Sequence, residues 1–422
     1  MRQHGRILLL SFYFPPDLGA GSFRSQALVE ALMKRLPAGY TLEVMTTAPN
    51  RYAQYASQAP AFETAYEGRL TVRRIELPSH RSGILDQSRA FAAYARQVSR
   101  LTRGQHYDLV IATSSRLMTA VLGRYVAGRV SARLYLDLRD IFVENLPFLL
   151  PKGARWLGIR FFSALERWAV SGAAKVNLVS PGFEAYFKPR YPEQAFTWHT
   201  NGVDPLFADS TRGDVTAQPS SFQSPIQNER ARESSRRLRI LYAGNIGTCQ
   251  GIDRILPTLA KRLEDRADFV LIGDGGKREA LEAALRIEGV PNVEIRPPVA
   301  RERLNEEYQK ADILFLHLND MFCFSRVIPS KLFEYAATGK PIWAGVRAFP
   351  AQFCNQHIEN VGVFEPCDSG AAVNALESLE LTARSREPFI KRFLRDKIME
   401  KMADDAVELL GSSTKQATAA SL

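Results

Sequence analysis

The chain has 422 residues, which predicts two or three domains and excludes a single small binding module. Its 45% apolar and 24% charged residues exclude the disordered and collagen-like classes. The net charge of +10 lies entirely in residues 1–209, which hold 26 Lys and Arg against 16 Asp and Glu. This asymmetry indicates an acidic partner such as nucleic acid, anionic lipid or a phosphorylated substrate, although a merely soluble basic surface explains it as well.

Residues 1–209 alternate short apolar runs with helical segments. The apolar runs predict strands within residues 6–14, 41–47, 107–114, 132–140 and 175–180. Helices are predicted at residues 22–36, 116–130 and 154–172. Short buried strands joined by crossover helices are typical of a parallel, doubly wound sheet, so we expect a Rossmann-like first domain.

A polar stretch separates this half from a second alternation of the same kind. Residues 210–237 have almost no apolar residues and no periodicity, which predicts a linker or a long surface loop. Further strands are predicted within residues 238–247, 268–276, 292–298, 311–319 and 341–346, with helices between them.

We therefore expect an α/β protein with two Rossmann-like, doubly wound domains that face a central cleft. The first domain comprises residues 1–209, and the second comprises residues 238–387. A terminal segment at 388–422 is predicted as an amphipathic helix at 388–410 followed by a frayed tail.

The first glycine-rich loop follows the first predicted strand. Gly19, Ala20 and Gly21 open the first helix, where free N–H groups and the helix dipole attract anions. Arg24 stands where the dinucleotide fingerprint needs its third glycine, which disfavours a dehydrogenase. Arg24, Asp137 and Arg139 are assigned with this loop to a predicted acceptor or phosphate site. The loop fits a phosphate or acceptor site and a flexible turn about equally well.

Three charged residues close the strand predicted at 132–140. Asp137 and Arg139 are expected on one face of that strand and Asp140 on the other, because side chains alternate. A carboxylate at this edge can orient or deprotonate an acceptor hydroxyl, and Arg139 can pair with Asp137 or hold a phosphate. We favour such a site over the alternative of a structural ion pair.

Two glycine loops follow neighbouring strands of the second half. Free N–H groups before a helix attract anions, and glycines let a ligand approach the backbone closely. Ordinary tight turns explain each loop taken singly, but the two together favour a ligand site. The residues of this predicted site are Gly244, Asn245, Gly247, Gln250, Gly273 and Gly275.

The stretch IPSKLFEYAATGKP predicts a short helix that Ser330 caps and that Gly339 ends. Lys331 then lies in the first turn, where a cation opposes the helix dipole and either reaches solvent or binds an anion. Glu334, one turn further on, can accept hydrogen bonds from the two hydroxyls of a ribose. A capped helix with a solvated Lys–Glu pair explains the pattern equally well.

Other features limit the possible functions. The four cysteines contain no C-x-x-C pair, which fits a reducing cytoplasm, and no apolar run approaches the ~18 residues that span a bilayer. His317, in an apolar run, is expected to be a hydrogen-bonded core histidine, and the scattered histidines predict no metal site. Residues 146–170 mix aromatic and basic residues as surface-bound amphipathic helices do, although a core-facing helix with a solvated basic face fits as well.

Six stretches, in chain order, resemble the motifs of family-4 glycosyltransferases with the GT-B architecture. They are FYFPPDLGAGSFR, LDLRDIF, NGVDPLF, YAGNIGTCQGID, LIGDGGKREALE and PSKLFEYAATGKP. The resemblance covers nearly the whole chain and implies an acceptor-binding first domain and a nucleotide-sugar-binding second domain. Within the family, the chain is similar to bacterial amino-sugar and deoxysugar transferases that build O-antigen or exopolysaccharide.

The resemblance also implies roles for single residues. Glu334 takes the position of the ribose-binding glutamate, and Ser330 and the two glycine loops belong to the donor site. The other glutamate of the family motif is replaced by Arg326, and the usual diphosphate-binding arginine and lysine by Asn245 and Gln250. Arg326 and Lys331 are the expected substitutes, because departure of the nucleotide requires positive charge.

The implied reaction retains the anomeric configuration and needs no metal or other cofactor. We expect a nucleotide-sugar donor, in the first place a UDP-sugar, a lipid-linked or saccharide acceptor, and Asp140 as the group that orients the acceptor. A basic first half suits a cytoplasmic enzyme peripheral to the inner membrane face. The alternatives are a non-catalytic GT-B binding subunit and a nucleotide-sugar epimerase, whereas nucleic-acid binding lacks a reader motif.

Overall fold

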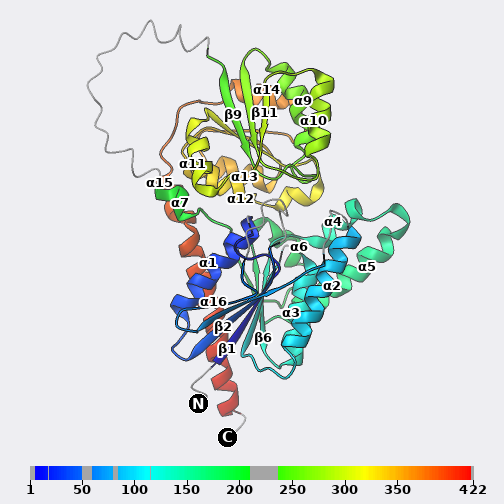
Figure 1. Ribbon diagram of the computed structural model, residues 1–422, viewed down its shortest axis with the longest axis vertical. Helices are drawn as coiled ribbons and strands as arrows, with labels where there is room; N and C mark the ends of the chain where they lie inside the picture. The colour runs from blue at the N-terminus through cyan, green and yellow to red at the C-terminus, as the bar shows by residue number, and fades with distance from the viewer. Residues whose placement is uncertain are drawn as a thin grey trace, which may run out of the picture. The chain divides into compact units, whose positions relative to one another are not determined.

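The computed structural model describes residues 5–17, 19–49, 59–78, 84–114, 116–209 and 236–419. The chain forms two compact units, and the boundary falls between Asn201 and Gly202, ahead of the one predicted at 209. Unit 1 comprises Met1–Asn201 and Arg395–Leu422, and unit 2 comprises Gly202–Leu394 (Figure 1). The predicted linker lies almost entirely outside the described residues. Among the described helices, none is both long enough and apolar enough to cross a membrane.

Unit 1 is built on an eight-stranded sheet in the order β3-β4-β2-β1-β5-β6-β7-β8. Its strands are β1 (Gly5–Ser11), β2 (Tyr40–Thr47), β3 (Phe62–Ala65), β4 (Leu70–Ile75), β5 (Leu109–Ser114), β6 (Arg133–Leu138), β7 (Lys175–Leu178) and β8 (Phe196–Thr197). All neighbours pair in parallel except β3 and β4, which form an antiparallel hairpin that the sequence did not predict. The doubly wound sheet was thus predicted correctly apart from its two edges, because neither this hairpin nor the short strand β8 was predicted.

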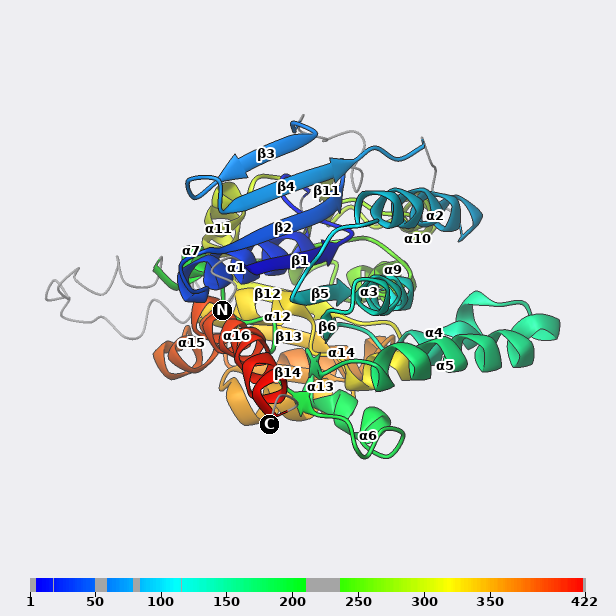
Figure 2. The ribbon, with the colours of Figure 1, turned by 90° about the horizontal axis from the view of Figure 1, so that it is seen from below.

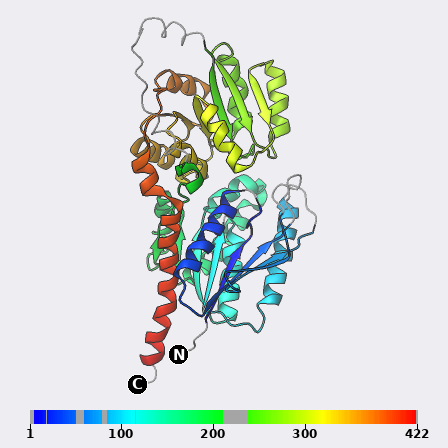
Figure 3. The same cartoon turned by 60° about the vertical axis from the view of Figure 1, so that its left-hand side comes forward.

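Helices cover both faces of this sheet. They are α1 (Ala20–Arg35), α2 (Ile84–Leu101), α3 (Leu117–Arg129), α4 (Phe142–Leu149), α5 (Arg155–Ser171), α6 (Glu184–Phe187) and α16 (Arg395–Ala419), with short 3-10 turns η2 (Lys152–Ala154) and η3 (Pro181–Phe183). Figures 1 and 3 show α16 running alongside α1 on one face, while α2 and α3 lie on the other.

The terminal segment differs from its prediction as one helix followed by a frayed tail. The backbone is extended at Leu394, which divides it into α15 (Glu387–Phe393) and the long α16, and α16 continues through the predicted tail to Ala419. Met399, Met402 and Ala403 of α16 are buried in the core that β1 and α1 share. The last helix is therefore a structural part of unit 1, although the rest of that unit ends at residue 201.

Unit 2 is a six-stranded parallel sheet in the order β11-β10-β9-β12-β13-β14. Its strands are β9 (Leu238–Ala243), β10 (Ala267–Ile272), β11 (Val293–Arg296), β12 (Ile313–His317), β13 (Ile342–Gly345) and β14 (Val361–Phe364). Its helices are α7 (Pro205–Asp209), α9 (Ile252–Arg262), α10 (Arg278–Glu288), α11 (Arg301–Lys310), α12 (Ser330–Ala337), α13 (Phe349–His357), α14 (Ser369–Glu377) and α15, with the 3-10 turn η4 (Phe322–Arg326). Two apolar cores fill the layers, one with α9, α10 and α14 and the other with α7, α11, α12, α13 and α15.

Candidate functional site

Each sheet has one point where the strand order reverses. In unit 1 it lies between β1 and β5, and in unit 2 between β9 and β12. Ligands of doubly wound sheets bind beyond the carboxyl ends of the strands at such a point. Of the loops predicted to bind ligands, those after β1 and β9 lie at the switch point of their own unit, and the third follows β10, the neighbour of β9.

The first loop starts α1 without a side-chain cap. Gly19 precedes the helix, Ala20 is its first residue, and the Gly19 carbonyl accepts a hydrogen bond from the N–H of Phe23 at 3.1 Å. Gly21 faces Arg139, because a Cβ at position 21 would lie 2.5 Å from Nη1 of that guanidinium. A glycine at 21 therefore lets the arginine lie against the first turn of α1.

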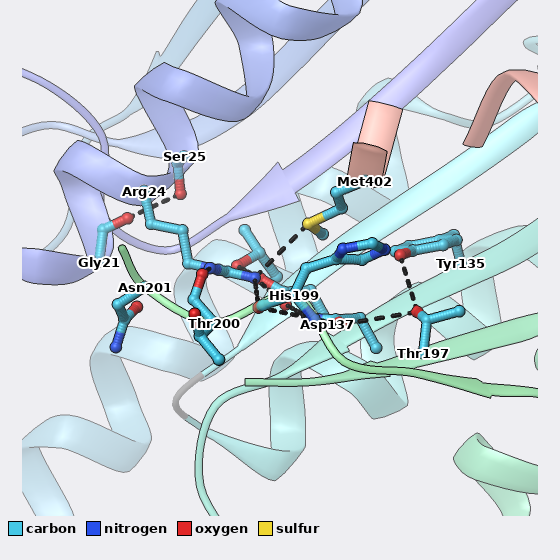
Figure 4. Close-up of polar contacts among 12 residues, drawn as sticks. Gly21, Arg24, Ser25, Tyr135, Asp137, Thr197, His199, Thr200, Asn201 and Met402 are labelled. Carbon is cyan, nitrogen blue, oxygen red and sulfur yellow. Dashed lines mark hydrogen bonds and ion pairs between the residues drawn. The ribbon is translucent and has the colours of Figure 1, made fainter. Parts of the chain in front are cut away.

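Arg24 and Asp137 lie inside unit 1 and bind each other (Figure 4). Nε and Nη2 of Arg24 donate to the two carboxylate oxygens of Asp137, each at 2.9 Å. The guanidinium also donates to the carbonyls of Thr200 and His199, at 2.7 and 2.8 Å, and lies 3.5 Å from the sulfur of Met402. Both side chains are almost fully buried, 1% exposed for Arg24 and 0% for Asp137.

Asp137 therefore belongs to a structural ion pair, which was the alternative to a ligand site, but its partner is not the expected one. Asp137 binds Arg24 rather than Arg139, and it also accepts hydrogen bonds from Thr113 and Asn177. Burial alone would raise the pKa of Asp137, but the charge and hydrogen bonds of Arg24 and the hydrogen bond from Asn177 outweigh burial and hold the pKa below its usual range. Neither side chain is placed to reach a ligand from the interior.

The surface-facing part of this region lies around Arg139. A hollow at the ends of β1 and β5 is lined by Ser11, Phe12, Tyr13, Thr113, Arg116, Thr119 and Arg139. Arg116, just before α3, donates to the hydroxyl of Tyr13 at 2.9 Å and stacks 4.7 Å from the ring centre of Phe12. Arg116 and Tyr13 were not predicted as site residues, although both lie within predicted elements, the helix at 116–130 and the strand at 6–14.

Asp140 follows Arg139 and has an unusual acidity. Loss of solvent raises the pKa of its carboxyl to about 7, and the positive charge of Arg139 opposes this shift. A carboxyl that changes protonation near neutral pH is suited to orient or deprotonate a hydroxyl.

In unit 2, the two glycine loops lie directly against each other. A Cβ at Gly273 would come within 1.8 Å of the Gly244 carbonyl oxygen, and one at Gly275 within 2.4 Å of the Ile246 carbonyl oxygen. Ile246 N–H also donates to the carbonyl of Asp274 at 2.9 Å. The structure therefore brings the predicted loops after β9 and β10 together, and only glycine permits this approach.

The loop after β9 is fixed by hydrogen bonds to its own side chains and to the end of β12. Asn245 donates to Oε1 of Gln250 at 2.9 Å, across the turn at Gly247. His317 Nδ1 lies 2.6 Å from the Gln250 carbonyl, and its Nε2 accepts from the N–H of Cys367 at 2.9 Å. Burial lowers the pKa of His317 to about 4, so the neutral ring donates at one nitrogen and accepts at the other. The prediction of a hydrogen-bonded core histidine is confirmed.

Lys331 and Glu334 form a buried cluster with Tyr308 of α11. Lys331 Nζ lies 2.7 Å from Oε2 of Glu334, and the Tyr308 hydroxyl donates to the same oxygen at 3.1 Å. The Glu334 side chain is 9% exposed and that of Lys331 is 25% exposed, so this is not the solvated pair of the alternative interpretation. The sequence did not predict Tyr308, whose role depends on the packing of α11 against α12.

Helix α12 is connected to the glycine loops through Tyr335, the residue after Glu334. The backbone N–H of Ala243, the last residue of β9, donates to the hydroxyl of Tyr335 at 2.9 Å. The expected cap at Ser330 is wrong: Ser330 is the first residue of α12, Pro329 precedes it, and no side chain caps the helix. Arg326 ends η4, with its guanidinium 5.4 Å from the ring centre of Phe322.

Within the residues that the structure describes, no three His, Cys, Asp or Glu side chains gather in a way that could hold a metal ion. Metal independence stays a prediction.

Comparison with known proteins identifies the family. A model described as "Glycosyl transferase 4-like domain" matches residues 20–195, and one described as "Glycosyl transferases group 1" matches residues 224–393. The chain is a family-4 glycosyltransferase. The two matches cover most of unit 1 and unit 2 respectively, so both the fold and the class of enzyme expected from the sequence are confirmed.

Two relatives with assigned names are similar to this transferase. WcaI of Escherichia coli, named as a colanic acid biosynthesis glycosyl transferase, is 24% identical over 347 residues, which is 79% of this chain and 81% of that protein. WbjE of Pseudomonas aeruginosa, named as a glycosyltransferase, is 26% identical over 269 residues, which is 60% and 61% of the two chains.

Solved structures share the GT-B fold with the transferase. Sucrose-phosphate synthase from Thermosynechococcus elongatus has a TM-score of 0.64 at 16% identity and covers 99% of this chain and 100% of its own. WaaG, a glycosyltransferase involved in lipopolysaccharide biosynthesis, has a TM-score of 0.61 at 16% identity, with 96% and 98% covered. HepE from Anabaena, solved with UDP and glucose, has a TM-score of 0.58 at 15% identity, with 99% and 100% covered.

Proposed function

We propose that the transferase moves a sugar from a UDP-sugar, with retention of anomeric configuration and without a metal, to a lipid-linked or saccharide acceptor in bacterial surface polysaccharide synthesis. The names of similar proteins support the pathway class, since one relative is named for colanic acid biosynthesis and one structural neighbour for lipopolysaccharide biosynthesis. The donor class is supported by HepE, which was solved with UDP-glucose. Catalysis at the inner face of the cell membrane, in the cytoplasm, is part of the proposal.

The observation that carries this proposal is the cluster of Lys331, Glu334 and Tyr308 beside the glycine loops. Glu334 is held in place by two donors and can accept hydrogen bonds from ribose hydroxyls, as the resemblance to the family implies. Gly244 and Gly273 let the backbone approach a nucleotide closely. The hydrogen bond between Tyr335 and Ala243 fixes the distance between helix α12 and the glycine loops.

The donor diphosphate needs positive charge, and the loop after β9 carries none at the positions where the family usually has it. Asn245 and Gln250 bind each other as neutral amides. In our proposal the charge comes from Lys331 in the first turn of α12 and from Arg326, five residues earlier in the chain. Both act by stabilising the negative charge that develops on the leaving phosphate.

The acceptor side of the proposal rests on the switch point of unit 1. Asp140, with its pKa near 7, orients the acceptor hydroxyl. Arg139 and Arg116 line the hollow there and suit an acceptor that carries phosphate, as a lipid-linked sugar diphosphate does. Gly21 provides the space for Arg139.

Thermal unfolding against UDP, GDP, dTDP, CMP and ADP tests the donor site, because a ligand at about 100 times its Kd adds about 2.7 kcal/mol to the free energy of unfolding. We expect UDP to raise the Tm and Glu334→Ala to remove most of that rise. Glu377→Ala, which removes an exposed carboxylate of the same unit, is the matched control and should leave the UDP effect intact. An unchanged UDP response in a folded Glu334→Ala variant would falsify the assigned role.

The neutral pair of Asn245 and Gln250 favours a second candidate, a GT-B subunit that binds nucleotide-sugar without transferring it. Donor turnover separates the two. Release of UDP from a UDP-sugar that depends on added acceptor, with the product anomer assigned by NMR, supports a retaining transferase. Stoichiometric binding with no turnover supports the binding subunit. Conversion of the UDP-sugar to its epimer without acceptor and without net release of UDP supports an epimerase.

A further inference from the structure

Helix α5 exposes more large apolar side chains than its packing explains. Trp156, Leu157, Phe161 and Trp168 are 70%, 67%, 58% and 45% exposed. Leu157, Phe161 and Trp168 follow one another at intervals of four and seven residues, which places them on one stripe of the helix. Figure 2 shows α4 and α5 extending away from the sheet of unit 1.

The opposite face of α5 is firmly packed, so the orientation of the helix is fixed. Ala169 and Val170 are fully buried. Glu166 is 3% exposed and accepts hydrogen bonds from the hydroxyls of Tyr186 and Tyr191, at 3.1 and 2.9 Å. The apolar stripe is therefore not the face by which α5 packs in the core. The face with Glu166, Ala169 and Val170 is packed there.

The charged side chains of α5 also differ between its two faces, with the carboxylate buried and the basic groups exposed. Glu166 is the one carboxylate among the 17 residues of α5, all of which are described, and it points inward. Arg160 and Arg167 are exposed, and the helical spacing puts them beside the apolar stripe. The Arg160 guanidinium lies 5.0 Å from the ring centre of Trp156, and Lys152 is exposed in the turn before the helix.

We propose that this face of α5, made of Trp156, Leu157, Arg160, Phe161, Arg167 and Trp168, docks on an anionic lipid surface. Indole and phenyl rings bury in the boundary between headgroups and acyl chains, while arginines beside them attract anionic headgroups. A second copy of the chain suits the face less well, because a symmetric pairing would bring the arginines of both copies together. The inference deepens the membrane location given under the proposed function, but it uses no residue of the nucleotide site, so its failure can be distinguished from failure of the proposed reaction.

Sedimentation of the full chain with vesicles tests the proposal directly. We expect binding to vesicles that contain phosphatidylglycerol, weak binding to pure phosphatidylcholine, and a loss of affinity as salt rises. Trp156→Ala with Phe161→Ala should reduce the affinity at least tenfold. Arg160→Gln with Arg167→Gln should reduce it roughly 25-fold, at about fivefold for each arginine near the surface.

Two controls match these changes in exposure and in charge. Ile287→Ala removes an apolar side chain that is 85% exposed in unit 2, and Arg96→Gln with Arg103→Gln removes two exposed charges of unit 1. Both should bind vesicles as the parent does. Circular dichroism and the UDP-induced rise in Tm should be unchanged in every variant, which separates a failure here from a failure of the nucleotide site.

Two results would overturn the proposal. One is equal loss of vesicle binding in the α5 variants and in the controls, which would indicate a nonspecific charge effect. The other is a reversible dimer, seen by sedimentation velocity and abolished by Trp156→Ala with Phe161→Ala, in a protein that ignores vesicles. That outcome would assign the face to contact between two copies.

Discussion

Removal of Arg24 should destabilise unit 1 severely, although the sequence suggests a ligand-binding arginine. In Arg24→Met, the Asp137 carboxylate stays buried and keeps only the hydrogen bonds from Thr113 and Asn177. The carbonyls of His199 and Thr200 lose their charged donor as well. Breaking a buried pair by removing one partner costs about 3–5 kcal/mol, because the other charge is left uncompensated.

The assay is thermal unfolding followed by far-ultraviolet circular dichroism. For a domain of this size each kcal/mol shifts the Tm by about 2–4 °C, so we expect a fall of about 6–20 °C in the transition of unit 1. Arg35→Met is the matched control, because Arg35 also lies on α1 and pairs with Glu400 and Asp404 of α16, but at 43% exposure. An exposed pair contributes about 0–1 kcal/mol, so this variant should shift the Tm by only a few degrees.

The dependence on pH gives a second, independent test. The pKa of Asp137 is depressed in the folded state, so its stabilising contribution is present above the ordinary value of 3.8 and is lost as pH falls through the folded pKa. Without Arg24, burial raises the pKa and the carboxyl protonates instead. The difference in unfolding free energy between parent and variant should therefore narrow in acid. Equal Tm values for Arg24→Met and Arg35→Met at neutral pH would refute the whole argument.

Two further predictions concern the candidate sites. Asp140→Asn should lower the transfer rate and abolish a rise in activity through pH 7, because the parent carboxyl ionises near that pH; an identical pH profile in the variant would remove Asp140 from the reaction. Because the folded pKa is raised, the unfolding free energy of the parent should fall as pH rises from the ordinary value of 3.8 to about 7 and level off above it, and Asp140→Asn should lack this fall. His317→Phe leaves the Gln250 carbonyl and the Cys367 N–H without this hydrogen-bond partner. We therefore expect the unfolding free energy to fall by about 2–4 kcal/mol and UDP to bind more weakly. UDP affinity equal to the parent's would show that the loop does not need His317.

Most of the fold could be predicted because its strands are short, apolar and buried on both sides. The runs ILLL and LFLH correspond to β1 and β12. Glycine loops follow β1, β9 and β10. The β3 and β4 hairpin was missed because FETA and LTVRRI contain charged and polar residues at the edge of the sheet, where one side is exposed. Strand β14 was also missed, because its four residues VGVF are too few to show a hydrophobic period.

Whether a part of the candidate site could be predicted depends on how far apart in the sequence its contacting residues lie. Lys331 and Glu334 are three residues apart on one helix, so the spacing alone predicts their contact. The burial of Arg24 depends on Met402, which lies 378 residues further along the chain. No local pattern distinguishes an arginine that opens a ligand site from one that a distant helix covers.

The net charge of the first half illustrates the same point for the whole surface. Residues 1–209 carry all of the +10, but α16 belongs to unit 1 and brings carboxylates from the other end of the chain. Its Asp405 and Glu408 bind Lys175, and Glu400 and Asp404 bind Arg35. Lys175 and Arg35 are therefore paired within the unit, although α16 brings four basic residues beside its five carboxylates and leaves the net charge of the unit nearly unchanged. On α5, Arg160 and Arg167 face solvent beside an apolar stripe, so we assign the acidic partner to that helix and not to the glycine loop.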